Sequence, residues 1–315
     1  MKTNFIANLQ AGTTLDNEPF LLHDLVRRKT KDGRPYLLCT LRDKTGQLGG
    51  VFWDVPDYID SWTKTGLVIL VTGRLTNFKE SLQLNLTDIN PATQVSMSDF
   101  LPSSRRPSAG MLAELKMRIK SLAQPWQDLV AAIMLDEALL PLLVEAPAAR
   151  GMHHAYIGGL LEHTLSMVAI AEMLASHYDY VNKDLLISGT LLHDIGKTIE
   201  YTISGEFSYS EDGRLVGHIV RAIVMVETAA AKLDFPENDL RQLIHLIASH
   251  HGTQEWGSPV VPKTLEAILL HQIDLLDSRV QGFMDHIHND TADETWTTKS
   301  SPMFQTELRR PDNMP

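Results

Sequence analysis

The stretch LLHDIGKTIEY, Leu191–Tyr201, decides how the second half of this chain folds. Two side chains that bind metals, His193 and Asp194, follow an apolar run directly, and Lys197 comes three residues after the aspartate. An apolar helix of this kind is buried, and a charge at its end is costly unless it is paired or coordinated. His193 and Asp194 therefore need partners from elsewhere in the chain.

Further histidines and carboxylates occur at intervals in a region whose apolar residues recur at helical spacing from Met111 onward. Taken singly, each has a structural explanation, such as a helix cap or a satisfied core histidine. Together they form a set of nitrogen and oxygen ligands that suits divalent metal ions, with no thiolate available. A set of this size invites two ions and a bridging carboxylate. Its members are His163, His193, Asp194, His218, His250, His251 and Asp274.

The first hundred residues have a different pattern, which is typical of β-structure. Turn signals at Lys31–Gly33 and Asp43–Gly46 separate strand-like runs. A segment with helix potential, Val55–Trp62, follows, and two more strands are joined near Asn77–Ser81. Short strands with a small helix after the third indicate an OB-fold barrel. The period of two predicts that Leu37, Cys39 and Leu41 share one face of their strand, and that Tyr36, Leu38 and Thr40 share the other.

The sequence thus predicts a multidomain protein, an N-terminal all-β OB-fold barrel followed by an all-α helical bundle. The barrel spans residues 1–95, and the Ser- and Pro-rich stretch 96–110 is a linker. The helical domain spans residues 111–288, interrupted by a polar loop or small hairpin at Tyr201–Gly217. Residues 289–315 have the composition of a flexible tail.

Composition restricts the classes of function. The net charge of −11 lies in residues 101–315, because basic and acidic residues balance in residues 1–100. Bulk acidity argues against a protein that coats duplex nucleic acid by charge alone, although a local groove is still allowed. One cysteine, Cys39, excludes an internal disulfide and fits the cytoplasm. No apolar stretch is long enough to span a membrane, and the N-terminus does not resemble a signal peptide.

The stretch GRPYLLCTLRDKTGQLGGVFWD, Gly33–Asp54, closely resembles OB domains that bind single-stranded nucleic acid. Such domains place aromatic and basic side chains on the face of strands 2 and 3, where bases stack and phosphates are held. The alternative is a small packing module without a ligand. The resemblance implies stacking by Tyr36, Trp53 and Phe78 and phosphate contacts by Arg34, Arg42, Arg74 and Lys79.

The helical part resembles the HD-domain metal-dependent phosphohydrolases. His163, the pair His193–Asp194 and Asp274 match the H…HD…D signature of that family, in the same order. Lys197 matches the lysine of the HDxxK variant. The additional histidines of members with two or more metals correspond to His218, His250 and His251. The resemblance implies an all-α HD domain with two divalent metal ions. Mn²⁺ is the favoured metal, and Fe, Mg²⁺, Co²⁺ and Ni²⁺ are the alternatives.

An OB-fold in front of an HD domain, with GMHHAYIGGLLEHT leading into the first ligand, resembles the YhaM-type 3′→5′ exoribonucleases. The likeness extends from about Phe20 to Val280. It implies hydrolysis of single-stranded RNA, and also single-stranded DNA, to nucleoside 5′-monophosphates. Asp194 would bridge the metals, and Lys197 would stabilise negative charge at phosphorus or orient water. His153 and His154 are candidates for a phosphate contact, with a structural role equally open.

Other HD-domain chemistries compete with this interpretation, since a fold does not fix a substrate. Cyclic-dinucleotide phosphodiesterases share the extra histidines, but their Gly-Tyr-Pro element is replaced here by GTQEWGSPVVP after His251. A nucleotide phosphohydrolase stays open but has no need of an OB-fold. A regulatory module that binds nucleic acid and keeps its metals without turnover is the alternative outside enzymes. Whether the chain forms a homo-oligomer is open too.

Overall fold

The computed structural model describes residues 2–79, 81–93, 95–151, 154–290 and 295–312. Contacts divide the chain into two compact units. One unit comprises Met1–Ser103 with Ile203–Ser208, and the other comprises Ser104–Thr202 with Tyr209–Pro315. The predicted combination of a β-barrel with a helical domain is confirmed. Among the described residues, no helix combines the length and apolar character that a membrane span requires.

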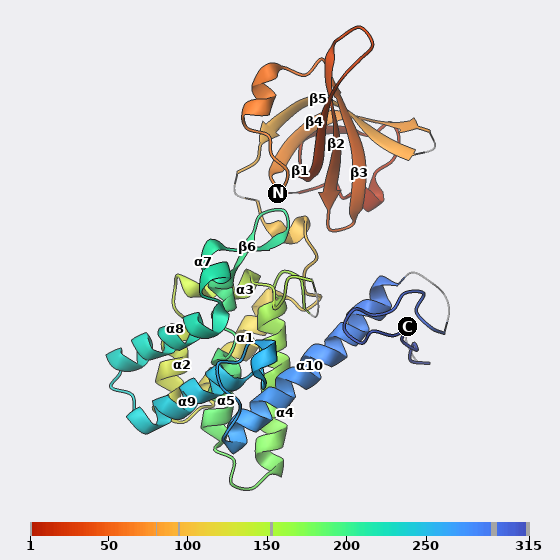
Figure 1. The fold of residues 1–315 in the computed structure, drawn as a ribbon. Coiled ribbons are helices and arrows are strands. Elements are labelled where there is room, and N and C mark those ends of the chain that lie inside the picture. The colour runs from red at the N-terminus through yellow and green to blue at the C-terminus, as the bar shows by residue number, and fades with distance from the viewer. Residues whose placement is uncertain (1, 80, 94, 152–153, 291–294, 313–315) are drawn as a thin grey trace. The chain divides into compact units, whose positions relative to one another are not determined.

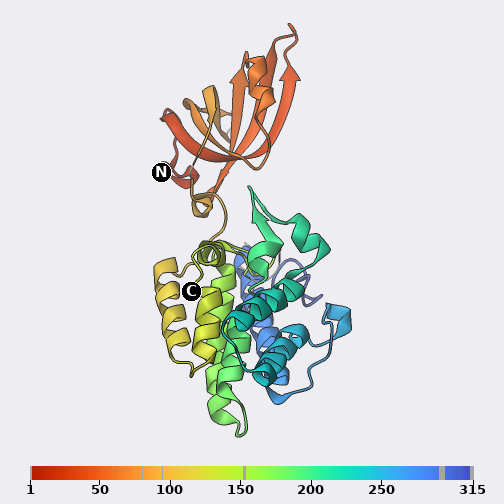
Figure 2. The same ribbon diagram turned by 90° about the vertical axis from the view of Figure 1, so that its left-hand side faces the viewer.

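The barrel closes in the order β1-β2-β3-β5-β4, with β3 and β5 parallel and the other pairs antiparallel (Figure 2). Leu37, Cys39 and Leu41 share one face, as the alternation predicts, and the structure shows that this face is the buried one. The segment with helix potential forms a short 3₁₀ helix, η2 (Asp57–Ser61). The strands are β1 (Thr14–Lys29), β2 (Pro35–Asp43), β3 (Gly46–Trp53), β4 (Val68–Phe78) and β5 (Ser81–Pro91).

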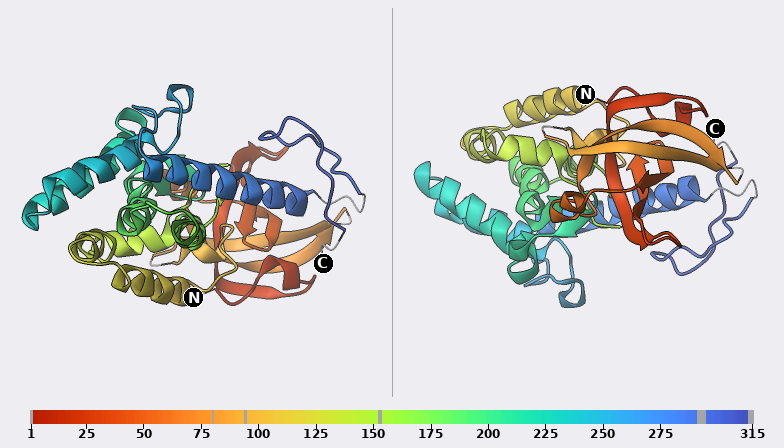
Figure 3. Two further views of the ribbon diagram at one scale, coloured as in Figure 1. Left: turned by 90° about the horizontal axis from the view of Figure 1, so that it is seen from below. Right: turned by 90° about the horizontal axis from the view of Figure 1, so that it is seen from above.

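The helical unit is built around α5 (Lys183–Leu192), which is buried on every side from Leu185 onward. The Asn182 side chain caps it by accepting a bond from the Leu185 amide at 3.1 Å. The long helix α10 (Leu265–Asn289) runs beside α4 (Gly159–His177) and also packs on α5 (Figures 1 and 3). The helices α8 (His218–Lys232) and α9 (Glu237–Ser249) form the neighbouring wall.

Shorter elements complete this unit. They are α1 (Ser108–Lys120), α2 (Trp126–Met134), α3 (Leu139–Glu145), α6 (Lys197–Glu200) and α7 (Glu211–Leu215). The stretch expected to be a polar loop or hairpin forms the hairpin β6 (Tyr201–Ile203) and β7 (Phe207–Tyr209), followed by α7. A 3₁₀ helix, η3 (Met97–Asp99), and the start of α1 lie in the stretch predicted as a linker.

The segment predicted as a flexible tail makes specific contacts where it is described. Trp296 and Arg309 form an isolated β-bridge, and Thr297 and Leu308 are buried. The Arg310 guanidinium donates to the Ile287 carbonyl at 3.1 Å. A cation that bonds the last carbonyls of a helix stabilises its C-terminus, so Arg310 ties this segment to the end of α10.

Candidate active site

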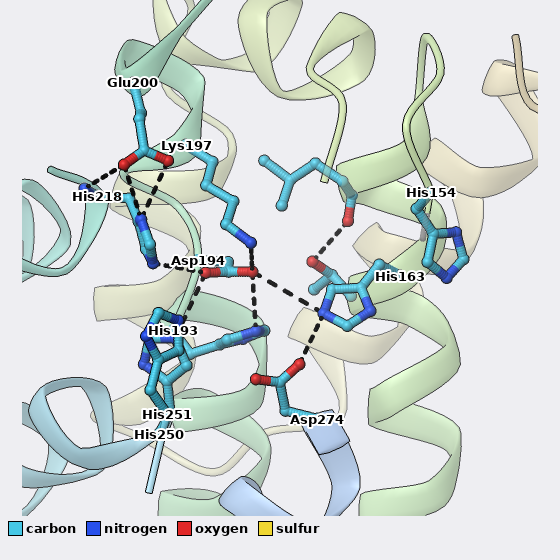
Figure 4. Close-up of polar contacts among 12 residues, drawn as sticks. His154, His163, His193, Asp194, Lys197, Glu200, His218, His250, His251 and Asp274 are labelled. Atoms are coloured by element: carbon cyan, nitrogen blue, oxygen red, sulfur yellow. Dashed lines mark hydrogen bonds and ion pairs between the residues drawn. The ribbon is translucent and has the colours of Figure 1, made fainter. Parts of the chain in front are cut away.

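The predicted metal ligands, far apart in the sequence, converge between the helices of the second unit (Figure 4). The turn between α5 and α6 depends on Gly196, since a Cβ there would lie 2.1 Å from the His218 carbonyl oxygen. Glycine thus allows the start of α8 to approach that turn. The ligands are His163 from α4, His193 and Asp194 after α5, His218 from α8, His250 and His251 at the end of α9, and Asp274 from α10.

The Asp194 carboxylate lies between two groups of ligands, with one oxygen directed to each. Its Oδ2 is 3.2 Å from His193 Nε2 and 3.9 Å from His163 Nε2. Its Oδ1 is 3.4 Å from His218 Nε2 and 3.6 Å from His250 Nε2. Asp274 completes the first group and His251 the second. This is the arrangement that a carboxylate bridging two ions requires.

The histidines present the correct nitrogen to the centre. The Nδ1 atoms of His193 and His250 lie 2.8 and 2.7 Å from the carbonyl oxygens of Thr190 and Ile247. A carbonyl only accepts, so each Nδ1 carries the hydrogen and leaves the Nε2 lone pair available to a metal. Burial, together with neighbouring His250, lowers the pKa of His251 to about 4, which keeps it neutral as a ligand must be.

The site's polar atoms fit a metal centre better than a metal-free core. Asp194 Oδ1 and the Nε2 atoms of His193, His218 and His250 are buried, and within the described residues none has a hydrogen-bond partner. Such groups cost roughly 1–3 kcal/mol each when they are left unsatisfied. Divalent ions at this centre would satisfy them and would supply the positive charge that Asp194 and Asp274 need in a buried site.

Two carboxylates that the sequence analysis missed orient the ligands. Asp277 Oδ2 accepts from His163 Nδ1 at 2.7 Å, and Glu200 Oε1 accepts from His218 Nδ1 at 3.0 Å. Partners of this kind fix the tautomer of a metal-bound histidine and raise its basicity. The available signal was spacing, because Asp277 follows Asp274 by three residues and so shares its face of α10.

Comparison with known proteins agrees with this geometry. The model of the HD domain matches residues 160–279, and that of the OB-fold nucleic acid binding domain matches residues 21–92. A protein of Geobacillus sp. (strain WCH70) named 3′-5′ exoribonuclease YhaM is 32% identical over 278 residues, which is 87% of this chain and 85% of that protein. The YhaM of Oceanobacillus iheyensis is 33% identical over 264 residues, 82% of this chain and 83% of the relative.

The chain belongs to the YhaM family. The YhaM of Listeria monocytogenes serotype 4b (strain CLIP80459), at 31% identity over 90% of each chain, extends the match across both domains. The sequence analysis predicted that an OB-fold precedes an HD domain in this chain, as in YhaM-type proteins, and this order is confirmed.

Lys197 lies at the centre of this YhaM-family site. Its Nζ is 2.6 Å from Asp194 Oδ2. Burial by itself disfavours both charges, but the ion pair outweighs it. The pKa of Lys197 consequently lies above its ordinary value, and that of Asp194 well below. A lysine that stays protonated beside the ligands is able to stabilise negative charge on a bound phosphate.

A pocket of about 240 Å³ opens beside the ligands of this YhaM-family chain. Among its lining residues are Lys197 and Asp274, which the sequence analysis assigned to catalysis and metal binding. The other lining residues are His250, His251, Trp256, His271, Leu275 and Ser278. Trp256 and His271 were not predicted to belong to the site, because nothing in their local sequence indicates that they share a cavity.

The two candidates for a phosphate contact have different outcomes. His153 lies outside the described residues. His154 is only 3% exposed, and its ring nitrogens lie 2.8 Å from the Tyr156 hydroxyl and 3.1 Å from Asp277 Oδ2. Because Asp277 also orients His163, this geometry favours a supporting role for His154 over contact with a substrate phosphate.

The barrel presents most of the side chains assigned to nucleic acid on its outer surface. Tyr36 and Trp53 pair across β2 and β3, with ring centroids 4.8 Å apart. Trp53 and Phe78 are about half exposed, at 51% and 53%. Lys79 Nζ lies 5.5 Å from the Phe78 ring. Arg34 is exposed but paired with Asp32 and Asp54, whereas Arg74 is exposed and Arg42 half-buried.

Proposed function

We propose that this protein is a metal-dependent 3′→5′ exoribonuclease that releases nucleoside 5′-monophosphates from single-stranded RNA. The observation that carries the proposal is the Asp194 carboxylate, whose two oxygens face two histidine groups in one buried site. The relatives' names supply the RNA substrate and the direction. The OB-fold supports a single-stranded substrate.

The residues of the site have separate roles in metal binding, ligand orientation and charge stabilisation. His163, His193 and Asp274 would hold one ion, His218, His250 and His251 would hold the other, and Asp194 would be shared between them. Bound divalent ions lower the pKa of water and polarise a phosphodiester. Asp277 and Glu200 keep His163 and His218 in the tautomer that ligates. The Lys197 ammonium, held by Asp194, stabilises the negative charge that develops on the phosphoryl oxygens.

The size of the pocket favours digestion from an end. Its volume of about 240 Å³ falls below the range of roughly 300–1,000 Å³ found for small-molecule sites. A space of this size suits one nucleotide of a strand and is too small for the terminal base pair of a duplex. We also expect single-stranded DNA to be cut, provided that the enzyme makes no contact with the ribose 2′-hydroxyl.

The proposal is tested with a 5′-labelled single-stranded RNA and Mn²⁺, and the products are resolved on a gel. A ladder that shortens progressively is expected, with nucleoside 5′-monophosphates released. The same RNA with a blocked 3′ end, or closed into a circle, should resist. Internal cuts in the circle would overturn the proposal, and phosphate release from mononucleotides alone would favour a nucleotide phosphohydrolase. Tight RNA binding with no product would favour a regulatory module.

The metal is tested in the same assay. Protein purified without chelator is expected to carry close to two transition-metal equivalents per chain, measured by elemental analysis. After treatment with a chelator, Mn²⁺ is expected to restore the RNA-degrading activity better than Mg²⁺. The reason is that the site offers five imidazoles, whereas Mg²⁺ prefers oxygen ligands. One equivalent at full occupancy, with His218 and His250 both dispensable for activity, contradicts the two-metal site.

A further inference from the structure

Trp256 presents an exposed aromatic ring beside the metal ligands. It belongs to the short 3₁₀ helix η4 (Gln254–Trp256), directly after the ligand pair at the end of α9. Its side chain is 53% exposed although it lines the pocket that Lys197 and Asp274 also line. Its ring centroid is 6.2 Å from that of His271, which forms another part of the same wall. The residue roles proposed for RNA hydrolysis do not include this indole.

The loop that carries Trp256 is held rigidly against the metal centre. His251 donates from Nδ1 to the Trp256 carbonyl at 2.8 Å, which links this loop to a ligand. The turn needs Gly252, whose φ is +83° and where a Cβ would lie 2.2 Å from the His271 ring. The Ser258 amide donates to the Thr253 carbonyl at 3.1 Å and closes the loop. A loop whose backbone is held in this way loses little freedom when a ligand stacks on the side chain that it carries.

We propose that the Trp256 indole is the stacking platform for the base of the terminal nucleotide at the metal centre. The inference rests on the proposed function and deepens it. A base has an apolar face that gains from stacking, whereas the phosphate and ribose of the same nucleotide need the polar side of the pocket. The pocket provides both, since it is lined by the indole of Trp256 and by the charged groups of Lys197 and Asp274. Stacking accepts every base, as a general exonuclease requires.

The experiment combines a change in the protein with a change in the substrate. Wild type and Trp256→Ala are compared on an RNA with an intact 3′-terminal nucleotide and on one whose 3′-terminal residue lacks its base. Wild type should prefer the intact end by about 5- to 150-fold in kcat/KM, the range that base stacking on aromatics gives. Trp256→Ala should lose this preference, with the loss mainly in KM because stacking binds substrate and transition state alike. Trp256→Phe should restore most of it.

A matched control separates stacking from a general effect of removing an indole. Trp296 is equally exposed, at 52%, and does not line the pocket. Trp296→Ala should therefore keep the preference of wild type. Trp256→Ala should also keep its metal content, because His251 bonds the backbone carbonyl of Trp256 and not its side chain.

A binding measurement keeps this inference separate from the proposed function. Titration of metal-loaded protein with adenosine 5′-monophosphate should give a Kd that Trp256→Ala raises by the same factor. If wild type fails to shorten RNA yet binds the nucleotide through Trp256, the proposed exonuclease function is refuted and the stacking role of Trp256 is supported. An RNA ladder from wild type, with equal nucleotide affinity and equal preference in Trp256→Ala, overturns the platform alone.

Self-association is the competing use of this surface, since Val260 and Val261 are also partly exposed nearby in the sequence. Light scattering behind a sizing column distinguishes the two. A change of molecular mass in Trp256→Ala, with unchanged nucleotide affinity, would assign the indole to an interface between copies and refute the stacking role.

Discussion

At the scale of single residues, the site depends on the charge of Asp194. Its two oxygens lie within 3.2–3.6 Å of three imidazole nitrogens from different helices, His193, His218 and His250. Asp194→Asn keeps the shape but leaves the shared cations without a bridging charge. We expect turnover of RNA to fall by at least about 10³-fold, which is about 4 kcal/mol in the barrier. A variant that retains a tenth of wild-type turnover with both metals bound would disprove the bridge.

Asp277 tests the effect of a group that touches a ligand and not the metal. Asp277→Asn removes the negative charge that accepts from His163 Nδ1 at 2.7 Å. We expect metal affinity, measured by competition with a chelating dye, to weaken by roughly 10- to 100-fold. Asp274→Asn, which changes a proposed ligand, should weaken it more. Equal losses in the two variants would mean that Asp277 ligates directly.

Cys39 gives a pH dependence that does not involve the metals. Burial inside the barrel raises the pKa of its thiol to about 12. The unfolded thiol ionises near pH 8.5. The folded state then holds a proton that the unfolded state releases, so stability is complete below about pH 8.5 and is lost as the pH rises toward 12. Between pH 8 and 10 the free energy of unfolding should fall by about 1–2 kcal/mol more in wild type than in Cys39→Ala, as measured by urea titration.

At the scale of elements, the register of the barrel strands separates two aromatic positions on its outer surface. Trp53 pairs with Tyr36 at one end of β3. Phe78 ends β4 and pairs with Ser81 of β5. Continuing the β3–β5 register two residues beyond the pair of Gly49 and Gln83 puts Phe78 level with Gln47, at the other end of β3. Six residues of strand correspond to about 20 Å. A single strand has to be several nucleotides long to reach both positions.

This separation gives a prediction that depends on RNA length. Trp53→Ala/Phe78→Ala should weaken binding of a long single-stranded RNA by about 2–6 kcal/mol, measured by fluorescence anisotropy. A di- or trinucleotide, which reaches only one position, should lose about half as much. Tyr58→Ala removes an exposed aromatic from η2 and serves as the control. Equal affinity of the double variant and wild type for long RNA would place the nucleic-acid face elsewhere.

At the scale of the whole molecule, the two units should respond differently to metal. Every proposed ligand belongs to the unit of Ser104–Thr202 and Tyr209–Pro315. Metal at 100 times its Kd stabilises the state that binds it by about 2.7 kcal/mol. Chelation should therefore increase hydrogen exchange in peptides of α4, α5, α8, α9 and α10 and leave peptides of β1 to β5 unchanged. Equal loss of protection in the barrel peptides would show that the two units unfold together.

The sequence by itself determined the domain classes and a set of candidate ligands. A period of two put Leu37, Cys39 and Leu41 on one face of their strand, and an apolar run of helical length required α5 to be buried. The resemblance to the HD family pointed to His163, His193, Asp194 and Asp274 as candidate ligands, because the chemistry of a metal site restricts residue type. Strand alternation and helical periodicity are local, so they can be read from short stretches of chain.

Only the tertiary structure decided which atoms meet. Asp277 accepts from His163 across 114 positions, and its spacing from Asp274 shows a shared face of α10 but not which residue it bonds. Glu200 and Trp256 likewise gain their roles from the packing of α6 against α8 and from the turn after α9. For His154, the sequence left a phosphate contact and a structural role equally open, and the structure buries it against Asp277. The reason is physical: ligand type follows from chemistry, whereas the partner of a buried polar atom depends on which helices pack together.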